Sequence, residues 1–580
     1  MSADFEKVLV KDPRLDVTDS VKYAVVKGGQ NVTVAPFRRI SESTSQIVFN
    51  VQVPSEQTII DRRVLLQTSL TVNVTSEFPS YGVYEALAAF PLAQLMTVLS
   101  VTINNNTVSL NVQDALPAII RLLCEDDLTW YNSASPAFAD MIGAYGLAGG
   151  LSNSNSALWG CNDPRRAHRG SFAPSSVSSV GSGASKVTTY VFKLTEPLLI
   201  SPFIYADLKS NNQGFYGIQN MNIIINLSGN ANRVWRGLSL RGGALSFANP
   251  SYKANTISAV TASVTDSTLL FTFLTPHPSD LMPARNIVPF YELPRYITPS
   301  NSAITAYVPG AIAINGQSTA QTTTITLNTL QLNQIPDKLI LYTRLASSLQ
   351  YWGNADVSLP IISVAVQFNN NAGILSTARQ VNLWEMSRDN GLTSSYSDWI
   401  GFGVGSVDQQ ASYVNPELGQ SISLVPTVGS YLCLEFGKDI QLTEDFYAAG
   451  SLGNFNLQVN VTVANNTIYD INVPAAAQLE VVLITMNSGV FVCERGTSST
   501  YTGILTKQDV LEASQQEHYT HDDVDRMVGG ASKFFSSLKS GLKNVGKRAK
   551  EHLAEHGADY ARSAMKHGKK ALSKYVMGDE

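Results

Sequence analysis

The chain of 580 residues carries one β-rich pattern twice, at an offset of roughly 250 to 275 residues. The pattern opens with a charged turn that leads into an apolar strand. A strand that ends in three consecutive asparagines follows, and a Leu-Thr-Glu triplet with an Asn-rich strand closes it. The first and second copies of these segments are 61–68 and 337–343, 100–106 and 363–371, and 194–225 and 442–461. Because the order is the same in both halves, we expect two similar domains in tandem.

The composition favours β-sandwiches over an α/β enzyme. Charged residues make up only 15% of the chain and hydrophobic residues 44%, while Ser, Thr, Asn, Val and Ile are frequent. Short strands that alternate with polar turns indicate about eight strands per unit, which is typical of a jelly roll. An immunoglobulin-like sandwich of ~100 residues could not absorb a unit of ~230 residues without very large loops. The predicted fold is all-β, two tandem jelly rolls (a double jelly roll) followed by a C-terminal amphipathic helical tail.

Prolines and helical spacing divide the chain further. Six prolines from Pro276 to Pro299 favour a connector with at most edge strands, because proline cannot donate to a β-ladder. One helix is expected early in each unit, at 114–124 and 377–386, and the Ser/Gly-rich region 149–185 is expected to be a surface excursion. The predicted organisation is an N-terminal arm at 1–45 with short strands at 21–26 and 31–37, a first jelly roll at 46–275, a Pro-rich connector at 276–295, a second jelly roll at 296–510, a flexible linker at 511–530 and a basic amphipathic tail at 531–580.

The sequence offers no membrane span, disulfide framework or metal motif. No apolar stretch reaches the ~18 residues of a membrane helix, and the first residues lack the apolar region of a signal peptide. We therefore expect the protein to be made and kept inside the cell. Four widely separated cysteines without CxxC or Cys/His spacing are expected to be buried free thiols: Cys124, Cys161, Cys433 and Cys493.

A search for enzyme chemistry nominates no catalytic residue, no cofactor and no metal site. The glycine-rich segment 401–406 has no following lysine, so a surface turn explains it better than a phosphate loop. Cys161 and His168 are close in sequence, but the spacing implies no third partner, and a basic loop is the commoner explanation. A solvated polar cluster, rather than a metal site, is expected from His518, His521, Asp522, Asp523 and Asp525. The sequence therefore argues against an enzyme.

Four short segments near the N-terminus, in register, resemble a known family. They are Asp-Pro-Arg-Leu at 12–15, Val-Val-Lys-Gly-Gly-Gln at 25–30, Pro-Ser-Glu-Gln-Thr at 54–58 and Asp-Arg at 61–62. Together they resemble the opening of the major capsid protein of virophages of the Sputnik type, and related polinton-like viruses are similar. The specific match covers about the first 75 residues, and beyond it the resemblance depends on length, tandem β units and the order of elements.

The resemblance implies a double jelly-roll subunit of a virion. Such a subunit would trimerise into a pseudo-hexagonal capsomer and build an icosahedral shell, with other copies of itself and a penton or vertex protein as partners. Assembly would occur in the host cytoplasm or a viral factory. Two similar sandwiches per chain agree with this role, because a trimer then presents six similar faces. The alternative is a trimeric β-sandwich spike or carbohydrate-binding module, which would be expected to show a stalk and clustered surface aromatics.

The last fifty residues, 531–580, differ from the rest of the chain. They hold eleven basic and five acidic residues, a net charge of +6, which leaves −11 for the remainder of a chain whose total is −5. Apolar residues at helical spacing form a stripe opposite the lysines, so this tail can lie on DNA, on an anionic membrane or on the capsid's inner wall. The candidate membrane or nucleic-acid contacts are Phe534, Phe535, Leu538, Lys539, Lys543, Lys547, Arg548 and Lys550.

A candidate cleavage site directly precedes this tail. The run Met527, Val528, Gly529, Gly530 and Ala531 is similar to the (Met/Ile/Leu)-x-Gly-Gly site of adenovirus-type maturation proteases, which implies a viral cysteine protease as partner. Paired glycines let an extended backbone thread a narrow active-site cleft. Two other segments fit the motif, at 147–150 and 240–243, but only the site at Gly530 stands at a sharp change of composition. A plain flexible hinge is the alternative.

Overall fold

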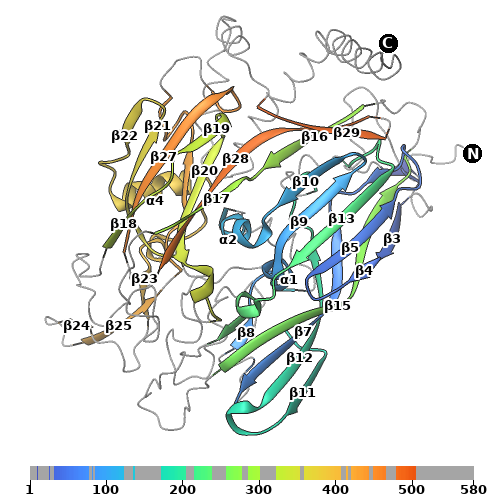
Figure 1. Ribbon diagram of the computed structural model, residues 1–580, viewed down its shortest axis with the longest axis horizontal. Helices are drawn as coiled ribbons and strands as arrows, with labels where there is room; N and C mark the ends of the chain where they lie inside the picture. The colour runs from blue at the N-terminus through green and yellow to red at the C-terminus, as the bar shows by residue number, and fades with distance from the viewer. Residues whose placement is uncertain are drawn as a thin grey trace, which may run out of the picture.

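Two β-sandwiches lie side by side in the computed structural model (Figure 1). The structure describes residues 9–10, 25–26, 32–77, 81, 85–122, 135–136, 172–203, 214–237, 257–276, 285–300, 322–352, 358–405, 413–415, 420–426, 428–442, 448–464, 478–494 and 496–503. No helix in these parts of the chain is long and apolar enough to span a membrane.

The first sandwich packs a six-stranded sheet against a five-stranded sheet, and all pairings within them are antiparallel. In spatial order the larger sheet contains β11 (Ser176–Val180), β12 (Val187–Pro197), β7 (Leu65–Ser76), β15 (Ile257–Leu274) and β3 (Val32–Arg38), with β6 (Ile59–Ile60) also on β15. The smaller sheet contains β10 (Asn106–Leu110), β9 (Met96–Ile103), β13 (Asn220–Leu227), β5 (Gln46–Gln52) and β4 (Ser41–Glu42).

The second sandwich has the same two-sheet plan. One sheet contains β16 (Arg285–Glu292), β28 (Leu479–Glu494), β20 (Lys338–Leu345) and β26 (Leu432–Glu435), with β17 (Arg295–Pro299) and β29 (Thr497–Thr502) also on β28. The other contains β18 (Thr322–Thr326) and β19 (Leu330–Gln334), which both pair with β27 (Leu452–Ala464), then β21 (Ile361–Phe368) and β22 (Asn371–Ile374).

Both sandwiches follow one strand order. When the eight principal strands of each are counted along the chain, one sheet has the order 1-8-3-6 and the other the order 2-7-4-5. In the first sandwich these are β3, β5, β7, β9, β10, β12, β13 and β15; in the second they are β16 with β17, β18 with β19, β20, β21, β22, β26, β27 and β28. This is the jelly-roll order, so the predicted double jelly roll is confirmed.

The repeated asparagines occupy equivalent hairpin turns, as the sequence predicts. Asn104 follows β9 with φ 53°, and Asn369 follows β21 with φ 51°, a left-handed conformation that asparagine tolerates better than most residues. Their N–H groups donate to the carbonyl oxygens of Asn220 and Asn456 at 2.9 and 2.8 Å. Their side-chain oxygens accept from the N–H groups of Gln219 and Asn456, both at 2.9 Å. Each turn is therefore fastened to the strand that neighbours it.

The expected helices are also equivalent. In each sandwich a helix follows the fifth strand and precedes the sixth: α2 (Val112–Leu122) in the first and α4 (Gln380–Asp389) in the second. The remaining described elements are α1 (Pro91–Leu95), α5 (Tyr396–Trp399), the 3-10 turns η6 (Gly183–Ser185), η7 (Ala231–Arg233) and η8 (Ser347–Leu349), and three small sheets made of β1 (Leu9–Val10) with β2 (Val25–Val26), β8 (Glu85–Leu87) with β14 (Trp235–Gly237), and β25 (Gln420–Pro426) with β23 (Phe402–Gly405) and β24 (Tyr413–Asn415).

Alternating burial explains why these segments form strands. In β5, Ile47, Phe49 and Val51 point into the core while the residues between them are exposed or half-buried, which is the period of two that a one-sided sheet requires. In contrast, β20 is buried along its whole length. A strand buried on both faces must have another layer outside its sandwich, and here that layer is the other sandwich.

Three predicted assignments need correction. Residues 32–38, assigned to the N-terminal arm, form β3 and pair with β15, so the first jelly roll begins before residue 46. The Pro-rich connector contains a strand of the second roll, β16, which stands at a sheet edge and so accommodates Pro289. The Leu-Thr-Glu repeat is not structurally equivalent, because Leu194 lies inside β12 whereas Leu442 lies beyond the end of β26.

Candidate functional site at the junction of the two sandwiches

Few of the residues singled out by the sequence fall within the described parts of the chain. The candidate cleavage residues from Met527 to Ala531 and the tail contacts from Phe534 to Lys550 lie outside them, as do Cys161 with His168 and the polar cluster 518–525. Cys433 and Cys493 are described, and both are the buried free thiols that the sequence predicts. Burial raises the pKa of the Cys433 thiol to about 11 and that of Cys493 to about 12, so neither is a ready nucleophile.

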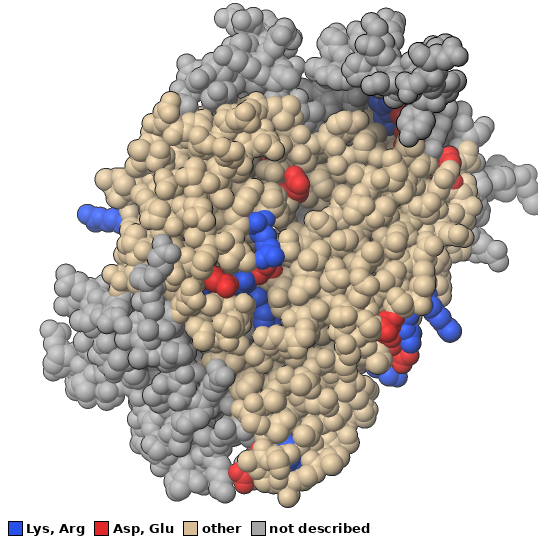
Figure 2. All heavy atoms as spheres, in the orientation of Figure 1, with Lys and Arg blue, Asp and Glu red and all other residues tan. Residues whose placement is uncertain are grey.

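The site that the structure does describe is the junction between the two sandwiches, which sequence reasoning did not nominate. Figure 2 shows that charged side chains are sparse on this face of the molecule and that a group of them gathers along the boundary between the sandwiches. Four sets of contacts make up the junction: a buried ion cluster, the end of α2, the crossing strand β28 and a small polar cavity.

An ion cluster fastens the start of α2 to the second sandwich. The Asp114 carboxylate pairs with Arg295 of β17 and, at 2.7 Å, with Arg344 of β20. Arg344 also pairs with Glu480 at 3.3 Å, and the Tyr342 hydroxyl donates to the Asp114 carbonyl at 2.7 Å. Burial opposes the charge on Arg344, but Tyr342 and the two carboxylates together raise its pKa, so the guanidinium stays charged. Asp114 is therefore neutralised across the junction, whereas Arg344 also has Glu480 as a partner within its own sandwich.

The C-terminal end of α2 is held in the same way. The last carbonyls of a helix have no partner inside it. Here the N–H and the hydroxyl of Thr393, from the second sandwich, donate to the carbonyl of Arg121 at 2.9 and 2.7 Å. The Arg121 guanidinium lies 4.3 Å from the ring centroid of Tyr431, a cation–π contact between the sandwiches. Both ends of α2 therefore depend on the second sandwich.

A single strand, β28, belongs to both sides of the junction. Its first half, 479–486, pairs with β20 inside the second sandwich, and its second half, 487–494, pairs with β16 and β29. In Figure 1 this strand runs from the second sandwich towards the first. At its far end the Ser498 N–H donates to the Asn105 side chain at 2.8 Å, and the Tyr216 hydroxyl donates to the Arg285 carbonyl at 2.8 Å. The three-stranded ribbon of β16, β28 and β29 thus clamps the first sandwich.

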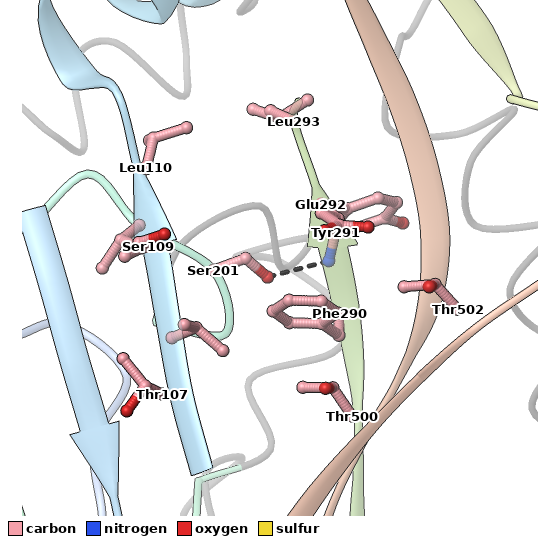
Figure 3. Close-up of a pocket in the computed structure, with 12 residues that line it drawn as sticks. Thr107, Ser109, Leu110, Ser201, Phe290, Tyr291, Glu292, Leu293, Thr500 and Thr502 are labelled. Carbon is pink, nitrogen blue, oxygen red and sulfur yellow. Dashed lines mark hydrogen bonds between the residues drawn. The ribbon is translucent and has the colours of Figure 1, made fainter. Parts of the chain in front are cut away.

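A cavity of about 150 Å³ lies between this clamp and β10 (Figure 3). The Tyr291 N–H donates to the Ser201 hydroxyl at 2.9 Å across it. Burial, with a smaller contribution from Asp337, raises the pKa of Tyr291 well above its ordinary value, so its phenol stays neutral. Most of the polar lining is hydroxyl: Thr107, Ser109, Ser201, Tyr291, Thr500 and Thr502, with Glu292 as the one carboxylate. A small cavity lined mainly by hydroxyls suits bound water.

Metal chemistry has no support in this part of the molecule either. Among the described residues no three His, Cys, Asp or Glu side chains come together in a group that could hold a metal ion. The junction is instead a set of interlocked polar contacts beside an apolar core that continues through both sandwiches. This arrangement holds two similar sandwiches in a fixed relative position.

Comparison with known proteins identifies the family. The model of the first domain of the Sputnik virophage major capsid protein matches residues 3–274, and the model of the C-terminal domain of the major capsid protein V20 matches residues 293–489. The putative capsid protein V20 of Sputnik virophage is 28% identical over 555 residues, which cover 93% of this chain and 86% of that protein.

Solved structures agree with the sequence matches. A chain of the Sputnik virophage, determined by cryo-electron microscopy, superposes with a TM-score of 0.69 at 25% identity, covering 89% of this chain and 97% of that one. The mavirus major capsid protein superposes with a TM-score of 0.65 at 15% identity, covering 87% and 96%, which shows a shared fold. Two family models that match successive domains, a relative along most of the chain and the observed double jelly roll together show that the chain belongs to the virophage major capsid protein family.

Proposed function

We propose that this capsid protein acts as a homotrimer, a pseudo-hexagonal capsomer that tiles an icosahedral shell. Family membership makes the chain a structural component of the virion rather than an enzyme, and it favours the capsid over the spike or carbohydrate-binding alternative. The observation that carries the proposal is the junction, because two similar sandwiches fastened by the ion pairs of Asp114 with Arg295 and Arg344 behave as one rigid unit. Three such units supply the six similar faces that a six-neighbour lattice position requires.

Sedimentation velocity of the purified full chain at micromolar concentration tests this proposal. The expected result is a species three times the mass of the 62.7 kDa chain, and negative-stain images of it should show hexagonal outlines. A stable monomer with no larger assembly would count against the trimer. A penton or vertex protein as partner, and assembly in the host cytoplasm or viral factory, remain parts of the same proposal.

A second part of the proposal is that a viral cysteine protease removes the tail after Gly530 during maturation. The support is the match to the paired-glycine motif at the boundary between the body and the basic tail. Mass spectrometry of mature particles should find chains that end at Gly530. Gly530→Val should block cleavage while Gly150→Val, at another match to the motif, should not. Intact chains ending at Glu580 in most subunits would refute processing.

Before cleavage the tail should bind an anionic surface inside the particle, either DNA or membrane. Its charge of +6 opposes the −11 of the body, and its apolar stripe offers a contact that charge neutralisation alone does not need. Salt separates the two partners, because binding through DNA phosphates weakens steeply as ionic strength rises, whereas burial of Phe534, Phe535 and Leu538 in lipid persists. Binding of the full chain to duplex DNA and to anionic vesicles across a salt series measures the difference.

A further inference from the structure

The contact between the two sandwiches is head to tail. The first sandwich contributes its helix α2, and the second contributes the outer face of the sheet that contains β17 and β20. These are different surfaces of two similar folds. A contact between unlike surfaces leaves each partner with one surface unused, which here means the helix side of the second sandwich and the outer sheet face of the first.

The helix that this contact leaves uncovered is α4, and its equivalent in the first sandwich, α2, is buried. Every residue of α2 except Gln113 is buried, whereas α4 buries only Leu383 and Ser387. Its exposed side includes Val381, which is 38% exposed, with Glu385 and Arg388 beside it. Because α4 exposes a valine whereas its counterpart α2 is covered, the exposed side of α4 has the character of a contact surface.

The unused sheet face shows the same contrast. In the second sandwich β20 is buried on both sides, whereas its counterpart in the first sandwich, β7, leaves its outward residues half-buried or exposed. Beside it in the same sheet, the outward residues Val34 and Val32 of β3 are 62% and 39% exposed. Leu270 of β15 is half-buried on the same side. The strand β7 carries no charged residue along its twelve positions, and Arg38 at the end of β3 is the charged residue of that strand on this side, so covering β7 and the start of β3 desolvates little charge.

We propose, resting on the trimer put forward above, that α4 of one copy docks on the outer face formed by β3, β15 and β7 of a second copy. The occupant is a second copy because the contact would repeat the one already made inside each chain, between the same kinds of element. Because a head-to-tail contact closes into a ring when its rotation allows, three chains would then supply six alternating sandwiches. In this contact α4 takes the place that α2 has in the junction, and the sheet of β3, β15 and β7 takes the place of the sheet that contains β17 and β20.

Cross-linking between two variants that each add one cysteine tests the contact directly, in a chain in which Cys124 and Cys161 are first changed to serine so that only the buried Cys433 and Cys493 remain. Val34→Cys on β3 and Val381→Cys on α4 are each purified alone, then mixed and treated with a short bismaleimide. The mixture is expected to give covalent dimers that neither variant gives alone, and the double variant is expected to give dimers and closed trimers. Val34→Cys mixed with Leu452→Cys, a site 51% exposed outside the proposed contact, is the matched control and should give no dimers.

A charge placed in the contact gives a second readout. Val381→Lys should raise the dissociation constant of the trimer by about tenfold, because the contact would remove the added charge from water and Glu385, one turn away on α4, offsets only part of that cost, while Leu452→Lys should leave the dissociation constant unchanged. Equal melting temperatures for the variants would show that folding is intact. If the wild type is a trimer, but the two cysteine variants do not cross-link and Val381→Lys does not weaken the trimer, the docking surface alone is overturned. A wild-type monomer would overturn the trimer itself.

Discussion

Glu196 shows how one buried carboxyl ties stability to pH. Its two oxygens accept the N–H groups of Leu92 and Ala93, at 2.9 and 3.0 Å, at the start of α1. Burial outweighs these bonds and raises its pKa from 4.5 to about 8. A carboxyl that holds its proton more tightly when folded stabilises the fold at low pH, and this contribution is lost as pH rises from about 4.5 to about 8.

The melting temperature should therefore fall over that pH range in the wild type, and Glu196→Gln should flatten the dependence, because a neutral amide does not titrate. Differential scanning fluorimetry in a pH series measures the melting temperature of each protein. Glu494→Gln is the control, since Glu494 is 42% exposed in its ion pair with Arg285. A Glu196→Gln profile with the wild-type slope would show that this carboxyl is ionised throughout.

Asp114 provides the second test at the scale of a residue. Asp114→Ala leaves the Arg344 guanidinium buried with only Glu480 to balance it, so the free energy of unfolding should drop by about 3–5 kcal/mol. Adding Arg344→Met should recover much of the loss, because an apolar side chain of similar size removes the uncompensated charge. Chemical denaturation of the wild type, the two single variants and the double variant gives the coupling free energy between Asp114 and Arg344. Additive losses in the cycle would mean that the two side chains do not interact.

At the scale of the element, the clamp made by β28 depends on a glycine. A Cβ atom at residue 489 would lie 2.1 Å from the backbone oxygen of Tyr501 in β29. Gly489→Ala should therefore push β29 away and destabilise the protein by about 1–3 kcal/mol. Hydrogen exchange should report faster exchange in 497–502. Gly229→Ala is the matched control, because nothing lies within 4 Å of a Cβ there. Unchanged protection of β29 in Gly489→Ala would show that the ribbon absorbs the methyl group.

Elements with a local signal were predictable from the sequence, and elements defined by a distant partner were not. The turns at Asn104 and Asn369 and the two helices are set by residues next to each other in the chain, so the repeat located them. The strand β3 was assigned to an arm because its partner β15 begins more than 200 residues later. The junction was missed for the same reason, since Asp114 lies in the predicted helix but Arg344 comes from the second unit.

At the scale of the whole molecule, the two sandwiches should unfold together. Each contributes polar groups that the other neutralises or satisfies, as Arg344 does for Asp114 and Thr393 does for Arg121. Opening the junction would expose these groups and the apolar surface of β20 at once. Scanning calorimetry of the full chain should therefore give one cooperative transition for both jelly rolls. Two well-separated transitions would show that each roll is stable without its neighbour.

The strand that crosses the junction is also among the last that a ribosome would release. β16 has to wait for β28, about 200 residues further along, before its edge is paired. A nascent chain can therefore pair the strands of its first jelly roll early, while it still lacks the second roll and the ribbon that stabilise it. A product of interrupted translation lacks the ribbon of β16, β28 and β29, so its two sandwiches are not held in the arrangement that a lattice subunit needs. Only chains read through β29 would be competent to join a growing shell.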